Sequence, residues 1–476
     1  MIDINLIRQN PDLIREAMEK LGDDTAKDRI DDIIALDLQR RELLTKSETL
    51  QAARNRLNKK MGPLRGNKKL DDSTKAALMR VAANAIAAGN YEDAERFMDF
   101  KDMKEGALDT SGDADVNVAM GKLVGELKQM SDVYGGYQDR IREVETELDE
   151  HMLWIPNLPH ETTPFGEGDE DNVPWEPEGN FRTFDFDIKP HWEIGETLNV
   201  IDFERGIKLH GSRGYVLRGW GARLQRALIA FFLDHAREHG FTEYYVPFMV
   251  LPEMLEGSAQ FPKFRDTVYE DRDAGFVMIP TSEVALTNLH RDEILEEADL
   301  PLYYTAHTPC FRRERMSAGS AIRGIKRVHQ FEKVEMFKFT TPENSYDELE
   351  SLTETASDIA RKLDLPFRRL VICSGDLGFS ATKKYDIEIY APGSDEWLEV
   401  SSCSNTEAFQ ARRANIRFRP EGGGKNDYVH TLNGSGLATP RVMIAIVENY
   451  QRADGGFDIP EVLRPYMGVD AITPGM

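Results

Sequence analysis

The first third of the chain carries two segments with the hydrophobic spacing of a helical hairpin. In the first segment leucines recur every seven residues, at Leu36, Leu43, Leu50 and Leu57, while the companion positions Arg40, Ser47 and Arg54 are polar. In the second segment, from Val116 to Leu148, apolar residues follow alternating steps of four and three, the spacing of a helix–helix seam. The two segments predict an antiparallel coiled-coil arm whose first helix ends at Gly62-Pro63.

A long polar bridge over residues 62–115 joins these two helices. It contains two further helical stretches, about 74–88 and 91–103. After the second long helix, residues 155–180 are dense in proline, glycine and acidic residues, which predicts a linker. We therefore expect three parts: a helical arm at 1–154, the linker at 155–180 and a globular domain at 181–476.

The globular part alternates short strand-like segments with a few helices. Helices are expected over about 222–239, where Gly240 supplies a C-terminal cap, and over 281–295, 346–363 and 441–450. Between them lie several β-branched and aromatic segments that are joined by short turns. Neighbouring strands without intervening helices predict an α+β fold, built on an antiparallel sheet flanked by helices, rather than βαβ repeats.

One of these strands, RVHQFEKVEMFKF (327–339), carries an unusual carboxylate. Side chains alternate between the two faces of a strand, so Glu335 shares a face with Phe331, Lys333, Phe337 and Phe339. Burying a carboxylate among large apolar side chains is costly unless a cation meets it. Glu335 is therefore a candidate binding residue for a positively charged group.

A second charged strand, CFRRE (310–314), precedes that one. Arg312 and Glu314 lie on one face, and Arg313 points to the other. A guanidinium binds phosphate or carboxylate with two parallel hydrogen bonds, although a cross-strand ion pair on a solvated face fits the same pattern. A Gly-, Ser- and Arg-rich loop links the two strands, which predicts a hairpin with charge on its inner face.

The net charge of the chain disfavours nucleic-acid binding by the body of the protein. The 59 basic and 83 acidic residues give −24 at pH 7. Residues 51–70 are an exception, with seven basic residues and no acidic one. This run is either a solvated helix face or a local phosphate-binding surface.

Other features narrow the class of protein. The three widely spaced cysteines argue against a disulfide framework, and the ten histidines show no metal-ligand spacing, so no protein-held zinc is expected. The N-terminus does not read as a targeting peptide, and the longest apolar run is far too short to span a bilayer. A cytoplasmic protein is the expectation.

Several motifs together resemble the class II aminoacyl-tRNA synthetases, and among them the seryl-tRNA synthetase family. The resemblance rests on FRRE (311–314) followed by VHQFEKVE (328–335), on GFTEYYVPFMV (240–250) and on PTSE (280–283). It extends to EVSSCSN (399–405), to HTLNGSGLATPR (430–441) and to the C-terminal ENYQ and PEVLRPYM. The similarity covers essentially the whole chain, the arm included.

The resemblance implies an ATP-dependent serine–tRNA ligase and a role for each motif residue. It implies that L-serine binds to Thr281, Ser282, Glu283, Glu335 and Ser435. It implies that Mg-ATP binds to Arg312, Arg313, Glu314, Val328, Glu399, Val400, Ser401, Ser402 and Arg441. Within that second set, Arg312 and Arg441 would be catalytic phosphate clamps, and Glu399 and Ser402 would offer hard oxygens to Mg²⁺.

The resemblance also implies partners. The arm would bind tRNA(Ser), with Arg54, Arg56, Lys59, Lys60, Lys68 and Lys69 as candidate phosphate contacts. The chain would form a homodimer, and it would also charge tRNA(Sec) with serine in an organism that has one. Gly434-Ser-Gly436 imitates part of a dinucleotide fingerprint but lacks its remaining features, so its small residues are expected to let the backbone approach the amino acid.

Two other functions remain open from the sequence. A paralogue could activate serine and load a carrier protein, although the long arm argues against it. The second alternative is an RNA-binding module without catalysis. The full set of charged residues at the predicted active site argues against it. The chain also departs from the family pattern at Ser320, where an arginine is usual, and in the length of the 62–115 bridge.

Overall fold

The computed structural model describes residues 1–100, 108–314 and 323–476, which form two compact units. One unit is residues 29–152, and the other combines residues 1–28 with residues 153–476. The first 28 residues, expected in the arm, thus pack with the globular part. Two contacts join them to it: the ammonium group of Met1 donates to the carbonyl of Phe409, and Asp3 pairs with Arg412 at 3.3 Å.

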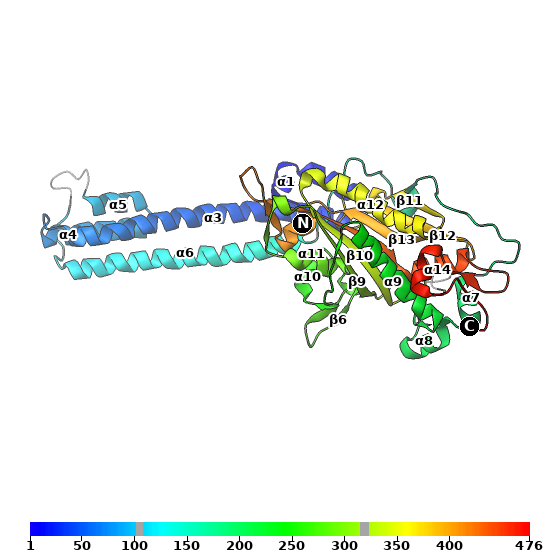
Figure 1. Cartoon of the computed structure of the whole chain (residues 1–476). Helices are drawn as coiled ribbons and strands as arrows, with labels where there is room; N and C mark the ends of the chain where they lie inside the picture. The colour runs from blue at the N-terminus through cyan, green and yellow to red at the C-terminus, as the bar shows by residue number, and fades with distance from the viewer. Residues whose placement is uncertain (101–107, 315–322) are drawn as a thin grey trace. The chain divides into compact units, whose positions relative to one another are not determined.

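The arm unit is built on two long helices, α3 (Asp24–Arg65) and α6 (Val116–Met152). The polar companion positions of the first helix are satisfied by partners on the second. Arg40 pairs with Glu145 at 2.8 Å, the amide of Gln138 donates to Ser47 at 2.7 Å, and Arg54 donates to Ser131 at 3.2 Å. These three contacts fix the register that a purely apolar seam would leave less specified. The predicted hairpin of two long helices is confirmed (Figure 1).

The bridge adds two helices beside this pair, α4 (Asp72–Ala87) and α5 (Tyr91–Asp99). Leu57, Met79 and Leu123 belong to one buried cluster that joins α3, α4 and α6. The sequence predicted that the first helix ends at Gly62-Pro63, but α3 continues to Arg65. Pro63 lacks the N–H that would donate to the carbonyl four residues before it, and the helix ends two residues later.

The globular unit is organised by an eight-stranded sheet of order β1-β11-β12-β13-β16-β10-β9-β4. Its strands are β1 (Val173–Pro174), β4 (Thr242–Glu243), β9 (Leu302–Phe311), β10 (Gln330–Thr340), β11 (Phe367–Val371), β12 (Lys383–Ala391), β13 (Glu396–Asn405) and β16 (His430–Ala438). Every pairing is antiparallel except that of β4 with β9. The antiparallel sheet expected from the sequence is confirmed.

Helices α9 (Trp220–Glu238), α12 (Ser345–Lys362) and α14 (Thr439–Asn449) pack on one face of this sheet (Figure 1). Phe232 of α9, Leu352 of α12 and Ile446 of α14 meet Val334 and Met336 of β10 in the main core. The opposite face of β10 carries the residues at odd positions, including Glu335.

The remaining elements are short. They are the helices α1 (Ile4–Gln9), α2 (Pro11–Lys20), α7 (His191–Thr197), α8 (Phe203–His210), α10 (Pro252–Gly257), α11 (Glu283–Thr287), α13 (Phe409–Ala414) and α15 (Arg464–Met467). Small sheets contain β2 (Ile201–Asp202), β3 (Val216–Leu217), β5 (Met249–Val250), β6 (Tyr269–Asp271), β7 (Phe276–Met278), β8 (Ile294–Glu296), β14 (Arg417–Arg419), β15 (Asp427–Tyr428), β17 (Phe457–Asp458) and β18 (Ala471–Ile472). Of the helices in the described ranges, none combines the length and the apolar character that crossing a bilayer requires.

Two sequence expectations about local structure are corrected. The helix predicted over 281–295 is the short α11, because the amide of Asn288 donates to the carbonyls of Val284 and Met254 and ends the helix there. Gly434 does not open the sheet toward an amino acid. A Cβ at this position would lie 3.0 Å from Cys403 Sγ and from Leu352 Cγ, so its lack of a side chain lets α12 pack on the sheet.

Candidate active site

A cleft of about 540 Å³ lies in the globular unit and brings ten of the predicted site residues together. They come from the start of α11 and the turn before it, from the segments that follow β9 and precede β10, from β13 and β16, and from the start of α14. The predicted residues that line the cleft are Thr281, Glu283, Arg312, Glu314, Val328, Glu399, Val400, Ser402, Ser435 and Arg441.

Glu335 lies directly behind the wall of this cleft and is completely buried. Its Oε2 pairs with the ammonium group of Lys333 and accepts a hydrogen bond from Thr281 Oγ1 at 3.3 Å. Its Oε1 is buried and has no hydrogen-bond partner within the described ranges. The carboxylate is therefore only partly neutralised, and one oxygen is left for a donor that the protein does not supply.

Strand register holds this carboxylate beside the predicted serine ligands. Glu335 lies opposite Ala306 of β9 and Ser435 of β16, and a bulge between Lys333 and Glu335 shifts the pairing with β16. The hydroxyl of Ser401 donates to the Ser435 carbonyl at 2.5 Å, which braces that strand.

Lys333 is a site residue that motif matching missed. Its ammonium group donates to Thr281 Oγ1 at 2.8 Å and lies on the cleft wall. The alternation along 327–339 could have found it, because Lys333 and Glu335 share one face of the strand. Gln410 was also missed: its amide donates to Glu283 Oε1 at 2.7 Å.

Glu283 is a second buried carboxylate in the same wall. Burial and the nearby charge of Glu335 raise its pKa to about 7, while Lys333, the hydrogen bond from Gln410 and Arg312 oppose the shift. Two carboxylates close together in an apolar wall resist being ionised at once. With its pKa at about 7, Glu283 binds a proton near neutral pH.

Two arginines lie on the other walls of the cleft. The Nε of Arg312 donates to the Pro280 carbonyl at 3.3 Å, and the guanidinium lies 5.1 Å from the centre of the Phe331 ring. Arg441, in the first turn of α14, donates to the Glu399 carbonyl at 2.5 Å and pairs with the Glu399 carboxylate at 3.5 Å. Both arginines line the cleft, and a guanidinium binds an anionic ligand through several N–H groups.

The acidic residues near these arginines differ in environment. Burial raises the pKa of Glu399, but Arg441, Lys384 and Arg312 more than reverse this effect, so the pKa is lowered and the group stays ionised. Ser402 lies opposite Asp386, a buried carboxylate with one oxygen that lacks a partner among the residues described. Burial raises the pKa of Asp386 to about 7. This set of hard oxygens fits a divalent cation.

Glu314 contributes its carboxylate between Arg213 and Arg327, at 3.9 and 3.7 Å. Its backbone has a positive φ of 43°, a strained conformation for a residue with a side chain. Such strain persists where the surrounding contacts impose it, and here the Glu314 carbonyl accepts a hydrogen bond from Arg213 at 2.7 Å.

Besides Glu335, three predicted active-site residues do not line the cleft. The hydroxyl of Ser282 points to the Ala306 carbonyl at 3.4 Å, and that of Ser401 is bound to Ser435. The guanidinium of Arg313 lies 5.9 Å from the Tyr269 ring centre. Their assigned roles stay predictions, as do those of the lining residues. Ser320 belongs to residues 315–322, outside the part of the chain that is described.

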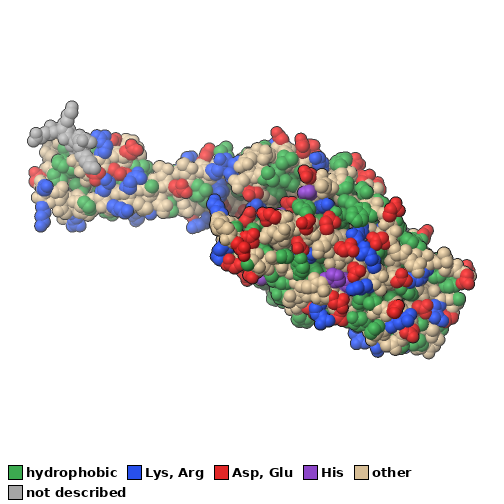
Figure 2. Space-filling model, turned by 45° about the horizontal axis from the view of Figure 1, so that its top comes forward, with side chains coloured by type: hydrophobic (Ala, Val, Ile, Leu, Met, Phe, Trp, Pro, Cys, Tyr) green, Lys and Arg blue, Asp and Glu red, His purple; other side chains and the backbone are tan. Residues whose placement is uncertain are grey.

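The basic run of the arm is partly neutralised by the bridge. Arg56 and Lys60 pair with Glu95 and Asp99 of the α5 region, and Arg54 lies 5.1 Å from the Tyr134 ring centre. Lys59, Lys68 and Lys69 are exposed. Figure 2 shows Lys and Arg side chains interspersed with acidic ones over the visible face of the arm unit.

One histidine cluster escaped the sequence search. His235 and His239 are four residues apart on the α9 helix and its C-terminal cap, and they meet Asp358 of α12 in a group that could hold a metal ion. The ammonium group of Lys362 lies 3.1 Å from His235 Nδ1 and already supplies positive charge there. The cluster shares no residue with the cleft lining.

Comparison with known proteins identifies the fold and then the family. Residues 266–450 match the tRNA synthetase class II core domain (G, H, P, S and T), and residues 1–96 match the seryl-tRNA synthetase N-terminal domain. A prolyl-tRNA synthetase from Giardia lamblia, 15% identical with a TM-score of 0.51, shares the fold alone. The globular unit is thus a class II aminoacyl-tRNA synthetase core.

Close relatives define which member of that class it is. The serine–tRNA ligases of Roseiflexus sp. (strain RS-1) and Chloroflexus aurantiacus (strain ATCC 29366) are 49% and 47% identical, each over 98% of both chains. The seryl-tRNA synthetase from Pyrococcus horikoshii complexed with ATP is 33% identical and has a TM-score of 0.84 over 100% of both chains. The chain belongs to the seryl-tRNA synthetase family. This class and its ATP-bound member imply a divalent metal.

The raised pKa of Glu283 predicts a pH-dependent stability. A carboxyl group with a raised pKa stabilises the fold fully below its ordinary value of 4.5, and the contribution is lost as the pH rises through about 7. Relative to Glu283→Gln, we expect the free energy of unfolding of the wild type to fall by about 3 kcal/mol between pH 4.5 and pH 8. Denaturant unfolding of both proteins over this range measures the difference, and parallel pH profiles would contradict it.

Proposed function

We propose that the cleft activates L-serine with ATP and then transfers it to tRNA(Ser), with the residue roles given below. Family membership makes the chain a serine–tRNA ligase, and serine, ATP and tRNA fit that family. The proposal concerns how the residues of this chain perform the reaction. The observation that carries it is the buried, half-satisfied carboxylate of Glu335, directly behind the wall of a cleft that Arg312 and Arg441 line.

Serine recognition rests on charge complementarity at both ends of a zwitterion. The free Oε1 of Glu335 accepts a hydrogen bond from the α-ammonium group of serine. The ammonium group of Lys333 faces the carboxylate of serine. Thr281 and Ser435 bind the small side chain, with Ser282 and Glu283 as supporting members of the pocket. A site that hydrogen-bonds the hydroxyl rejects alanine strongly, whereas excluding threonine depends on the space for one methyl group, roughly 1–3 kcal/mol.

Activation proceeds by in-line attack of the serine carboxylate on the α-phosphorus of ATP. Diphosphate leaves, and seryl-adenylate remains. Arg312 neutralises the α-phosphate, Arg441 binds the γ-phosphate, and Glu314 with the Val328 backbone accepts the adenine. Positioning and charge neutralisation of this kind supply most of the rate enhancement in phosphoryl-type transfers.

The divalent metal would be Mg²⁺, and Glu399 and Ser402 would hold it. Mg²⁺ prefers octahedral oxygen ligation and commonly bridges phosphate oxygens. The lowered pKa of Glu399 supports the assignment, because the ligand must be ionised. When bound, the metal screens charge on the triphosphate. Arg313, Val400 and Ser401 complete the proposed ATP set.

In the second step, a ribose hydroxyl at the 3′ end of the tRNA attacks the carbonyl carbon of seryl-adenylate, and AMP leaves. The arm binds the tRNA through its phosphates. Lys59, Lys68 and Lys69 are the strongest candidates among the predicted basic residues, because Arg54, Arg56 and Lys60 already have partners within the arm. Charging of tRNA(Sec) extends the same proposal.

The proposal includes a cytoplasmic homodimer. Exposed apolar side chains around β5 support it, since Tyr245, Met249 and Leu251 are 88%, 57% and 46% exposed. Clustered apolar exposure of this kind marks interaction surfaces. The region overlaps GFTEYYVPFMV (240–250), one of the motifs that carry the family resemblance.

Replacing Glu335 with alanine tests the serine pocket. We expect the KM for serine in ATP–diphosphate exchange to rise at least about 100-fold, since losing one partner of a buried charge pair costs roughly 3 kcal/mol or more. The KM for ATP should change by less than about threefold. Glu332→Ala is the matched control, because Glu332 lies on the same strand and pairs with His307 on the other face. Unchanged serine kinetics in Glu335→Ala would refute the role.

Replacing the three exposed arm lysines separates tRNA binding from chemistry. In Lys59→Ala/Lys68→Ala/Lys69→Ala, we expect the KM for tRNA to rise about tenfold or more, with a weaker salt dependence. Serine-dependent ATP–diphosphate exchange should match the wild type. Lys75→Ala provides a control within the same unit, because Lys75 pairs with Asp72. Equal loss of charging and exchange would contradict a tRNA-binding role for the lysines.

Charging by the wild type discriminates among the three functions considered. A serine–tRNA ligase shows serine-dependent ATP–diphosphate exchange and forms an alkali-labile seryl ester on tRNA. A carrier-loading enzyme would retain exchange but leave tRNA uncharged. A non-catalytic RNA-binding module would retain neither activity, and either of these two results would overturn the proposal.

A further inference from the structure

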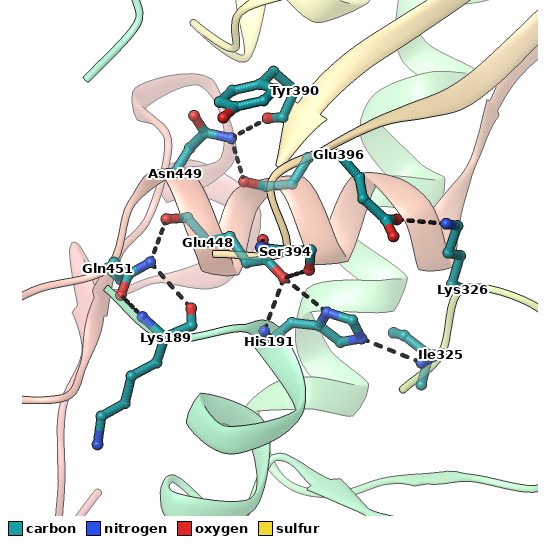
Figure 3. A network of polar contacts seen from close by, with 11 residues as sticks. Lys189, His191, Ile325, Lys326, Tyr390, Ser394, Glu396, Glu448, Asn449 and Gln451 are labelled. Atoms are coloured by element: carbon teal, nitrogen blue, oxygen red, sulfur yellow. Dashed lines mark hydrogen bonds and ion pairs between the residues drawn. The ribbon is translucent and has the colours of Figure 1, made fainter. Parts of the chain in front are cut away.

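A buried polar network lies behind the ATP end of the cleft, centred on Glu448 near the end of α14 (Figure 3). Glu448 has no exposed surface. Its Oε1 accepts hydrogen bonds from the backbone N–H of His191 at 2.9 Å, from His191 Nδ1 at 2.8 Å and from Ser394 Oγ at 2.7 Å. Its Oε2 accepts one from the Ser394 N–H at 2.9 Å. A buried carboxylate with four donors is fully satisfied and rigidly held.

This environment fixes the tautomer of His191. Because the Glu448 carboxylate only accepts, Nδ1 of His191 carries the proton that it donates. The neutral ring then presents a lone pair at Nε2, which accepts the N–H of Ile325 at 3.3 Å. The imidazole is 3% exposed, so water competes little for either bond.

Backbone geometry confirms that Ile325 is held closely against the ring. The preceding residue, Gly324, has a positive φ of 77°, and a Cβ there would lie 2.0 Å from His191 Nε2. A side chain at this position would displace the segment from the imidazole. Trp192, next to His191 in α7, adds a second contact, since the Arg323 guanidinium lies 4.8 Å from its ring centre.

The segment that His191 holds is part of the cleft. Ile325, Lys326, Arg327 and Val328 all line it. The Lys326 carbonyl accepts a hydrogen bond from the Arg441 guanidinium at 3.5 Å, and the Lys326 ammonium group pairs with Glu396. Arg441 begins the helix on which Glu448 lies two turns later. One imidazole therefore joins the hairpin segment to the helix that carries the second phosphate-binding arginine.

We propose that His191 is a positioning residue for ATP. Its Nδ1–H bond to Glu448 and its Nε2 bond to Ile325 hold residues 325–328 at a fixed place relative to α14. Val328, which is proposed to accept the adenine, and Arg441 are then correctly placed relative to each other before ATP binds. The effect is specific for ATP, because among the described residues no hydrogen bond or ion pair joins Thr281, Lys333, Glu335 or Ser435 to the network. This inference rests on the proposed function of the cleft.

Two substitutions at His191 separate this role from simple support of Glu448. An asparagine amide occupies roughly the place of Nδ1, so His191→Asn keeps a donor for Glu448 and loses the acceptor for Ile325. A glutamine amide reaches roughly to Nε2, so His191→Gln retains an acceptor for Ile325. We expect His191→Asn to raise the KM for ATP about five- to tenfold, as the loss of one buried hydrogen bond implies. His191→Gln should stay within about twofold, and the KM for serine should change in neither variant.

Three further measurements keep the test decisive. Ser394→Ala removes a donor from Glu448 without contacting Ile325 and should leave the KM for ATP unchanged. Gly324→Ala displaces the segment from the ring, so it should reproduce the ATP-specific defect even if His191→Asn folds poorly. Hydrogen exchange of the Ile325 amide should be faster in His191→Asn than in the wild type or in His191→Gln.

Opposite results would overturn the inference. These are a wild-type KM for ATP in His191→Asn or Gly324→Ala, a defect in His191→Gln that exceeds that of His191→Asn, or parallel increases in the KM for ATP and for serine. A wild type without serine-dependent exchange would contradict the proposed function instead. In that case protection of the Ile325 amide would still decide whether His191 holds the segment.

Discussion

The active site depends on a carboxylate that the sheet buries but only half neutralises. Glu335 has no exposed surface, and Lys333 and Thr281 occupy one of its oxygens. A carboxylate without any partner in this position would destabilise the fold or take up a proton. A carboxylate whose oxygens were both paired within the protein could not bind a ligand. The register of β10 against β9 and β16 makes the arrangement possible. A slip of one residue would exchange the odd and even faces, bringing Val334 to the cleft and Glu335 beneath the helices.

The two faces of the sheet therefore have different tasks. The helix face is a conventional core in which Val334 and Met336 meet α9, α12 and α14, and Gly434 lets α12 come close. That packing holds α14, whose first turn delivers Arg441 to the cleft and whose end carries Glu448. The opposite face supplies the serine wall. Because the strands of one sheet are shared, tight helix packing on one side determines where charges lie on the other.

Local patterns in the sequence predicted what local physics controls. The spacing of apolar residues predicted α3, α6, α9 and α12, and the alternation along β10 placed Glu335 among apolar neighbours. Of the site residues that the family motifs predicted, ten line one cleft. The patterns failed where distant residues decide the outcome. The pairing of Arg56 with Glu95 and of His191 with Glu448 joins positions 39 and 257 residues apart. No periodicity encodes such contacts.

Charge within the arm shows how such distant pairing changes an inference about function. A chain with a net charge of −24 needs a local positive surface to bind tRNA phosphates. The run of seven basic residues in the sequence predicts such a positive surface. In the structure, however, Glu95 and Asp99 neutralise Arg56 and Lys60, and Arg54 lies against Tyr134. The exposed lysines that remain give a weaker and more localised potential. Since exposed charges act over about 8–10 Å at physiological salt, such a surface would guide tRNA at short range and leave specificity to the fit between the arm and the folded RNA.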